Sequence, residues 1–306
     1  MPKTKFFKLR SEQDGLDLAL MAVYPDGEVR ALVQLAHGMC EHKKRYQKFM
    51  EYLAGQGCLC VINDHRGHGE SVKKKDDLGY FYQNGDMALV EDLHQVSKWL
   101  KAQAPEKKLF LFGHSMGSLA VRVYTEKYDA EIDSLVVCGS PGANPAAGIG
   151  LGLIRLLSLI RGERYRSSMI RQLVTGSFAR RFPGEGGESW LSRRPENVKN
   201  YQNDPLCGYT FTLNGYAALL RLMRRTYGKR GECANEKLPI HFYSGADDPC
   251  MPDHNGFVHA MESMKKAGYT DVSGHLFEGL RHEILNEENG EEIWQRIWQE
   301  AFAPYI

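Results

Sequence analysis

Apolar and polar residues alternate in two different patterns along the chain. Short apolar runs rich in β-branched, leucine and aromatic residues predict eight strands, at residues 6–10, 17–24, 31–36, 59–63, 108–112, 134–139, 240–244 and 274–278. Longer stretches with apolar residues every three or four positions predict helices, at residues 46–56, 86–103, 116–128, 253–267 and 288–302. This alternation predicts an α/β fold with a mostly parallel eight-stranded sheet flanked by helices. The first two runs, which flank a turn near residues 13–15, predict an antiparallel hairpin.

The alternation stops between residues 142 and 237, where no run is typical of a strand. This stretch has 16 Lys and Arg against 7 Asp and Glu, whereas the whole chain has a net charge of +1. We interpret residues 142–237 as an inserted helical cap, and residues 1–141 and 238–306 as the core domain. The alternative is a large insertion on the surface of the core domain, with an arginine-rich face exposed to solvent.

Two stretches of the expected cap combine apolar and basic residues. Residues 148–161 predict a helix that is apolar over most of its surface, and residues 219–225 predict a second apolar and basic helix. The first helix either packs against the core or faces lipid or an acyl chain. Arginines beside apolar faces are typical of contact with anionic lipid surfaces, so peripheral membrane contact is a hypothesis for this cap.

Composition narrows the classes of protein to consider. The chain has 306 residues, of which 42% are hydrophobic and 25% charged, as in globular proteins with a sizeable core. The net charge of +1 gives no indication of nucleic-acid binding. We expect a cytoplasmic location, because the N-terminus lacks the apolar core of a signal peptide, no window is apolar enough to span a membrane, and seven scattered cysteines suit a reducing compartment.

The sequence GHSMG at residues 113–117 follows directly after an expected strand and precedes an expected helix. In the strand–turn–helix form of G-x-S-x-G, the serine lies at a sharp turn that exposes its hydroxyl above the edge of the sheet. The turn forces a positive φ at the serine, and glycines on either side avoid collisions. The positive end of the following helix helps to hold an oxyanion. The pattern therefore predicts Ser115 as a catalytic nucleophile.

A serine nucleophile needs a base, and the base needs an orienting acid. In chain order the acid and then the histidine follow the serine in this arrangement. Asp247 and Asp248 follow the expected strand 240–244, and both remain candidates for the acid, with Asp248 favoured. His282 lies in the loop after the last expected strand, which is the place for the base.

Two backbone N–H groups must also be available to hold the negative oxygen of a tetrahedral intermediate. We expect one from Met116, which follows the nucleophile, and one from Met39 in the loop at residues 37–42 (HGMCEH). The polar sequence DHRGHGES at residues 64–71 predicts a hydrogen-bonded loop that supports the loop 37–42. The alternative interpretation of residues 64–71 is a metal site. The possible ligands in this sequence are loosely spaced, and no other part of the chain supplies further ligands. His37 is interpreted as a residue that braces its loop.

These motifs together resemble the monoacylglycerol lipase and lysophospholipase branch of serine α/β-hydrolases. The branch typically has H-G-x-x-E-H, D-x-x-G-H-G-x-S and G-H-S-M-G in this order, and D-P-L at residues 204–206 and G-x-x-D and G-x-x-H ending at Asp248 and His282 are also similar to it. The resemblance implies the α/β-hydrolase fold, with Ser115, Asp248 and His282 as triad and the amides of Met39 and Met116 as oxyanion hole.

The resemblance also implies a serine ester hydrolase that acts on monoacylglycerols, lysophospholipids or similar acyl esters, without a metal or an organic cofactor. Relatives usually have small residues where this chain has Met39 and Cys40. We expect these larger side chains to narrow the acyl side of the expected pocket. A small-ester carboxylesterase is therefore the first alternative. An aminopeptidase of the same fold, or a non-catalytic ligand-binding member, are the others.

Overall fold

The computed structural model describes residues 1–251 and 254–306. Its strands form one sheet in the order β1-β2-β4-β3-β5-β6-β7-β8. The strands are β1 (Lys3–Arg10), β2 (Asp17–Tyr24), β3 (Ala31–Ala36), β4 (Cys58–Asn63), β5 (Leu109–His114), β6 (Ser134–Cys138), β7 (Ile240–Gly245) and β8 (Val272–Phe277). The pairs β1–β2 and β2–β4 are antiparallel, and the remaining pairs are parallel.

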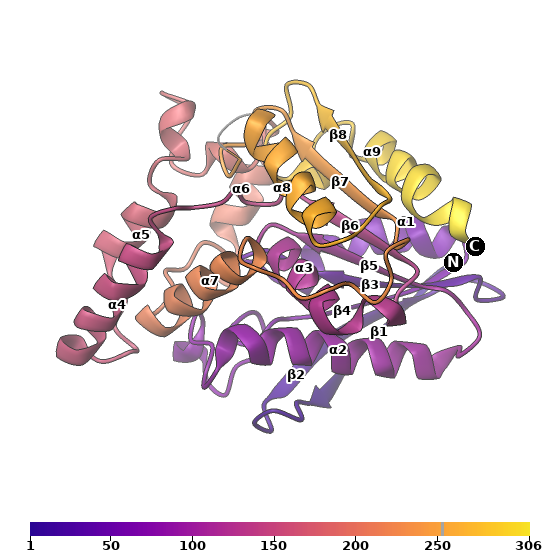
Figure 1. Cartoon of the computed structure of the whole chain (residues 1–306), viewed down its shortest axis with the longest axis horizontal. Helices are drawn as coiled ribbons and strands as arrows, with labels where there is room; N and C mark the ends of the chain where they lie inside the picture. The colour runs from indigo at the N-terminus through magenta and orange to yellow at the C-terminus, as the bar shows by residue number, and fades with distance from the viewer. Residues whose placement is uncertain (252–253) are drawn as a thin grey trace.

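Helices cover both faces of this sheet (Figure 1). The core helices are α1 (Gln47–Gly55), α2 (Gly85–Gln103), α3 (Met116–Tyr128), α8 (His254–Lys266) and α9 (Gly290–Ile297). Buried side chains of α1 and α9 share one apolar cluster with the sheet, and those of α2, α3 and α8 share the cluster on its other face. The strands β3 to β6 are buried at every position, because side chains on both of their faces meet helices.

All eight expected strands are present, and the differences are confined to their ends. The N-terminal hairpin is confirmed by the antiparallel register of β1 and β2. The expected helix 288–302 is wrong in one respect, since α9 ends at Ile297 and a π-helical turn, Trp298–Phe302, follows it. The expected helix 253–267 is observed as α8 from His254, and Asp253 lies outside the described residues.

The segment between β6 and β7 contains four helices and short 3₁₀ turns, and no strand occurs in it, since all of its residues are described. The helices are α4 (Ala147–Arg161), α5 (Ser168–Thr175), α6 (Pro195–Asn203) and α7 (Leu213–Thr226). Figure 1 shows α4 and α5 farther from the sheet than α7. We call residues 139–239 the β6–β7 segment.

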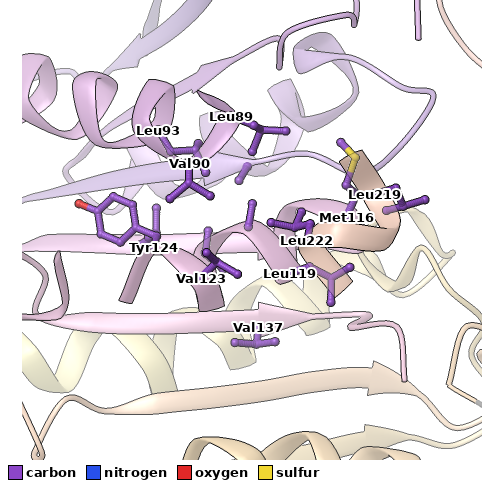
Figure 2. Close-up of a cluster of buried hydrophobic side chains, with 14 of the residues drawn as sticks. Leu89, Val90, Leu93, Met116, Leu119, Val123, Tyr124, Val137, Leu219 and Leu222 are labelled. Atoms are coloured by element: carbon purple, nitrogen blue, oxygen red, sulfur yellow. The ribbon is translucent and has the colours of Figure 1, made fainter. Parts of the chain in front are cut away.

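One helix of the β6–β7 segment packs directly on the core (Figure 2). Leu219 and Leu222 of α7 are buried in the same apolar cluster as Met116 and Leu119 of α3. Thr212 precedes the α7 helix, and its hydroxyl accepts a hydrogen bond from the Gly215 N–H and thereby caps the helix. The β6–β7 segment is therefore anchored on the helix that follows Ser115.

Candidate active site

Ser115 lies at the junction of β5 and α3, where the chain reverses sharply. Its backbone has φ 53° and ψ −119°, a conformation that costs a residue with a side chain about 1–3 kcal/mol. The surrounding strand and helix hold it there, and only 6% of the residue is exposed. This geometry confirms the strand–turn–helix form of the motif and aims the N-terminus of α3 toward the serine hydroxyl.

The glycines of the motif are explained by close packing around this turn. A Cβ on Gly117 would lie 2.2 Å from the Ala36 carbonyl oxygen, and one on Gly113 would lie 2.6 Å from the Gly117 oxygen. Gly38 in the neighbouring loop is also restricted, because its Cβ would lie 2.7 Å from Glu41 Oε1 and 3.1 Å from the Ser115 Cβ. Side chains at these positions would push α3 away from the sheet and displace the serine.

His282 and Asp248 form a buried pair beside this turn. The distance between His282 Nδ1 and Asp248 Oδ2 is 2.8 Å, and the two residues are 2% and 1% exposed. The second Asp248 oxygen accepts a hydrogen bond from the Cys250 N–H at 2.9 Å. A carboxylate held in this way fixes the orientation of the imidazole and stabilises it when it is protonated.

The two neighbouring aspartates have different environments. Asp247 is exposed, and its N–H donates to the Leu280 carbonyl oxygen at 2.9 Å. Asp248 instead points inward, toward His282 and the Ser244 hydroxyl. Of the two carboxylates, Asp248 is therefore the one next to the histidine.

The two expected oxyanion donors both have free N–H groups. Met116 is the first residue of α3, and Met39 lies in the loop after β3, next to Gly38. In the part of the chain that the structure describes, neither N–H donates to an acceptor. The first N–H groups of a helix have no partner within the helix and are available to an anion.

Glu41 braces the loop that carries Met39. Its Oε1 accepts hydrogen bonds from the Gly38 N–H at 2.6 Å and from the Tyr46 hydroxyl at 2.8 Å. Burial raises the pKa of the Glu41 carboxyl, but the hydrogen bond with His114 and the charge of Arg45 outweigh it and keep the pKa below its ordinary value. The loop is thus tied to an ionised, buried carboxylate, which keeps the donor in place before substrate arrives.

The polar loop 64–71 forms hydrogen bonds with the loop 37–42, as its sequence predicts. The His65 N–H donates to His37 Nε2 at 2.9 Å, and His65 Nε2 lies 3.1 Å from the His37 carbonyl oxygen. Asp64 accepts from the N–H of Lys43 at 2.8 Å and pairs with its ammonium group. The bracing role expected for His37 is confirmed by these contacts.

Burial keeps the histidines of this loop neutral, which predicts a pH-dependent stability. Burial lowers the pKa of His65 to about 3 and that of His68 to about 4. Below pH ~6.5 the unfolded chain takes up protons at these histidines and the folded protein does not. The free energy of unfolding should therefore be highest above that pH and should fall as the pH decreases below it. We expect a loss of about 2 kcal/mol per histidine by pH 5.

Urea unfolding at pH 8, 6.5 and 5 measures this loss. The variant His65→Gln removes one of the two groups, and its stability should fall less steeply over the same interval. An equal slope in the variant and the wild-type protein would contradict the assignment.

Sequence reasoning missed three residues that contact His282, namely Trp190, Cys250 and His114. The Trp190 ring lies over the imidazole, with ring centroids 5.1 Å apart, and Cys250 Sγ lies 3.9 Å from Nε2. No sequence signal identifies Trp190, since it comes from the β6–β7 segment. His114 was also passed over, although it is part of the motif; its Nε2 lies 3.2 Å from the His282 carbonyl oxygen.

Comparison with known proteins identifies the family. The family model described as "Serine aminopeptidase, S33" matches residues 27–289. Monoacylglycerol lipase of Mycolicibacterium smegmatis is 27% identical over 267 residues, which cover 86% of this chain and 85% of that protein. Human monoglyceride lipase is 26% identical over 269 residues, which cover 86% of this chain and 78% of that protein.

Solved structures show the same fold. A thermostable carboxyl esterase from Bacillus coagulans matches with a TM-score of 0.88 and 24% identity, covering 97% of both chains. Monoacylglycerol lipase of Paleococcus ferrophilus matches with a TM-score of 0.71 and 26% identity, covering 92% of this chain and 97% of that one. The expected α/β-hydrolase fold is therefore confirmed, and the chain belongs to the serine aminopeptidase S33 family, in the branch that contains the monoacylglycerol lipases.

Proposed function

We propose that this serine ester hydrolase cleaves monoacylglycerols, lysophospholipids or similar acyl esters through Ser115, His282 and Asp248. The observation that carries the proposal is the strained Ser115 at the N-terminus of α3 together with the buried His282–Asp248 pair. The ester class is supported by relatives and structural neighbours that are named lipases and esterases. The acyl-ester substrates are supported by those among them that are named monoacylglycerol lipases.

In the proposed mechanism the Ser115 hydroxyl attacks the ester carbonyl carbon while His282 Nε2 accepts its proton. Asp248 holds Nδ1 and stabilises the imidazolium, and the N–H groups of Met39 and Met116 bind the oxyanion. His282 then gives the proton to the leaving alcohol. A water molecule, deprotonated by His282, attacks the acyl-enzyme; His282 returns that proton to Ser115 Oγ as the fatty acid is released.

We also propose that residues 142–237 form the cap over this site. Trp190 of this stretch lies against His282, and α7 packs on α3 directly behind the nucleophile. The cap also contacts residues 37–42, which we call the oxyanion loop, since the Gly208 N–H donates to the Cys40 carbonyl oxygen at 3.0 Å. A cap with these contacts shapes the space that the acyl chain and the alcohol occupy.

The acyl chain length tests the proposed substrate class. We expect the kcat/KM for p-nitrophenyl esters, measured from acetate to palmitate, to rise toward the long chains, because buried methylenes stabilise the transition state by about 0.8 kcal/mol each. Enzyme inactivated with a fluorophosphonate is the control for uncatalysed hydrolysis. A maximum at acetate or butyrate would instead indicate a small-ester carboxylesterase, with the Met39 side chain restricting the pocket.

Two further functions are distinguished by two other assays. An aminopeptidase would cleave aminoacyl p-nitroanilides, which requires an acidic site for the substrate's amino group. Glu188 is an acidic side chain in contact with Trp190: it accepts a hydrogen bond from the Trp190 indole N–H and pairs with Arg171 at 3.2 Å. We therefore expect no aminoacyl cleavage. A non-catalytic receptor would not react with a fluorophosphonate, whereas we expect one labelled serine per chain.

We propose that α4 makes peripheral contact with anionic membranes. Ile149, Leu156 and Ile160 are 80%, 56% and 70% exposed, and their spacing places them on one face of the helix, opposite the buried Ile154. Arg155 and Arg161 on the same helix are exposed as well. Apolar side chains beside arginines are typical of helices that bind anionic lipid surfaces. In the described residues no helix is long and apolar enough to cross a membrane.

Sedimentation with phosphatidylserine-containing vesicles at low salt tests this contact. We expect Ile160→Glu to weaken binding about tenfold or more, because it removes an exposed apolar side chain whose burial in lipid is worth about 1.5–3 kcal/mol and adds a negative charge. Val258→Glu on α8 makes the same change at another exposed position and should bind as the wild-type protein does. Absence of binding by the wild-type protein would overturn the proposal.

A further inference from the structure

Three potential metal ligands from distant parts of the chain meet where the oxyanion loop contacts the β6–β7 segment. His42 ends the loop that carries Met39, and Asp204 and Cys207 lie in the turn between α6 and α7. His42 Nε2 lies 2.9 Å from Asp204 Oδ2, and the ligand atoms of all three residues lie within 4.8 Å of one another. His42 and Cys207 are buried, and Asp204 is partly exposed.

The chemistry of these donors suits zinc. One imidazole nitrogen, one carboxylate oxygen and one thiolate sulfur, with water in a fourth position, form a tetrahedral set of the kind that zinc prefers. Bonds of about 2.0–2.3 Å would place the ligand atoms roughly 3.3–3.7 Å apart, so small movements of the side chains complete the geometry. Asp204 is already oriented, because its Oδ1 accepts from the Leu206 N–H at 2.8 Å and leaves Oδ2 toward His42.

The surrounding charges favour a cation. Glu41 and Glu283 lie around Arg45, which bonds Glu283 through both guanidinium nitrogens and lies 3.6 Å from Glu41. The lining of the adjoining cavity has eight Asp and Glu against four Lys and Arg, so negative charge exceeds positive charge there. Water and ions reach the position through a cavity of about 580 Å³, whose lining includes Asp204 and Cys207.

We propose that His42, Asp204 and Cys207 bind a zinc ion that fastens the oxyanion loop to the β6–β7 segment. On binding, the Cys207 thiol forms the Zn–S bond and loses its proton to water, so one proton is released for each ion bound. The ion would add to the existing bonds between the same two regions, from the Gly208 N–H to the Cys40 carbonyl oxygen and from Cys40 Sγ to the Tyr209 carbonyl oxygen. This proposal departs from the expectation, drawn from the sequence, that the protein binds no metal.

A second group of possible ligands, Asp248, Cys250 and His282, lies in the candidate active site. Both oxygens of Asp248 are already engaged there, one by His282 Nδ1 and the other by the Cys250 N–H. Asp204 is engaged in a similar way, by His42 Nε2 and by the Leu206 N–H, but it is partly exposed and lines the cavity, whereas Asp248 is buried. Access from the cavity therefore favours the group at His42 over the buried group at His282.

Titration of the chelator-treated full-length chain with Co²⁺ tests the proposal, because a cobalt–thiolate bond gives a charge-transfer band in the near ultraviolet. We expect one equivalent of Co²⁺ to produce the band. Adding Zn²⁺ should displace the Co²⁺ and remove the band. Cys207→Ser should abolish the band, and Asp204→Asn, which keeps the shape of the side chain, should weaken Co²⁺ binding about tenfold or more. Cys250→Ser and Cys233→Ser should leave the band unchanged.

Three results would overturn the proposal: no band in the wild-type protein, a band that persists in Cys207→Ser, or a band that disappears in Cys250→Ser. If Cys207→Ser does not fold, an unchanged Co²⁺ affinity in Asp204→Asn would do the same. Thermal unfolding adds a second readout, since an ion that binds only the folded chain raises the Tm of the wild-type protein and of Cys250→Ser, but not of Cys207→Ser.

Discussion

Replacing Ser115 with alanine should lower kcat for ester hydrolysis by a factor on the order of 10⁶. Under the proposed mechanism this residue forms the acyl-enzyme, and without its hydroxyl no covalent route remains. The expected residual rate comes from the oxyanion donors and from substrate binding, which do not need the hydroxyl. Single-turnover hydrolysis of the best p-nitrophenyl ester measures the effect directly.

The structure offers controls for this result. Ser177→Ala changes an exposed serine of the β6–β7 segment and should keep full activity. Ser115→Ala retains the strained backbone at this turn, so its circular dichroism and Tm should stay close to those of the wild-type protein. If the variant retains more than about a hundredth of the wild-type kcat while folded, Ser115 is not the nucleophile.

The second large effect is expected at Asp248. Asp248→Asn should lower kcat by about 10⁴, because an amide in place of the carboxylate removes the negative charge beside His282 Nδ1 and favours the wrong tautomer of the imidazole. The loss is expected in kcat rather than in KM, since Asp248 is buried behind His282 and contacts no substrate in the proposed mechanism.

Asp247→Asn provides the matched control, with the same chemical change one residue earlier. Asp247 is exposed, and its backbone N–H, which the substitution preserves, makes its bond to Leu280. We expect its kcat to remain within about twofold of the wild-type value. Comparable losses at both positions would mean that Asp248 does not act through His282.

Much of the fold was predictable because it depends on interactions between near neighbours in the chain. The eight strands and the core helices follow from apolar periodicity, which reflects the face that each element buries. The turn at Ser115 was predictable for the same reason, since the glycines and the run of β5 before it restrict the local backbone. The end of the C-terminal helix was not, because the change to a π-helical turn at Trp298 has no signal in the periodicity.

The contacts around the candidate site depend on the tertiary structure. Apolar periodicity places Asp247 and Asp248 in one loop, but only the packing of that loop against the His282 loop distinguishes the buried carboxylate from the exposed one. The exposed face of α4 is a similar case, since its sequence suits burial as well as lipid contact.

The amino-acid sequence by itself determined the α/β architecture and the positions of Ser115 and His282 after strands. It could do so because apolar periodicity and the residue preferences of turns depend on only a few neighbouring residues. The tertiary structure alone decided that Trp190 lies over His282 and that His42 meets Asp204 and Cys207. Those partners are more than 90 residues apart, so no local rule relates them. They meet because the sheet and the helices of the β6–β7 segment bring their loops to the same place.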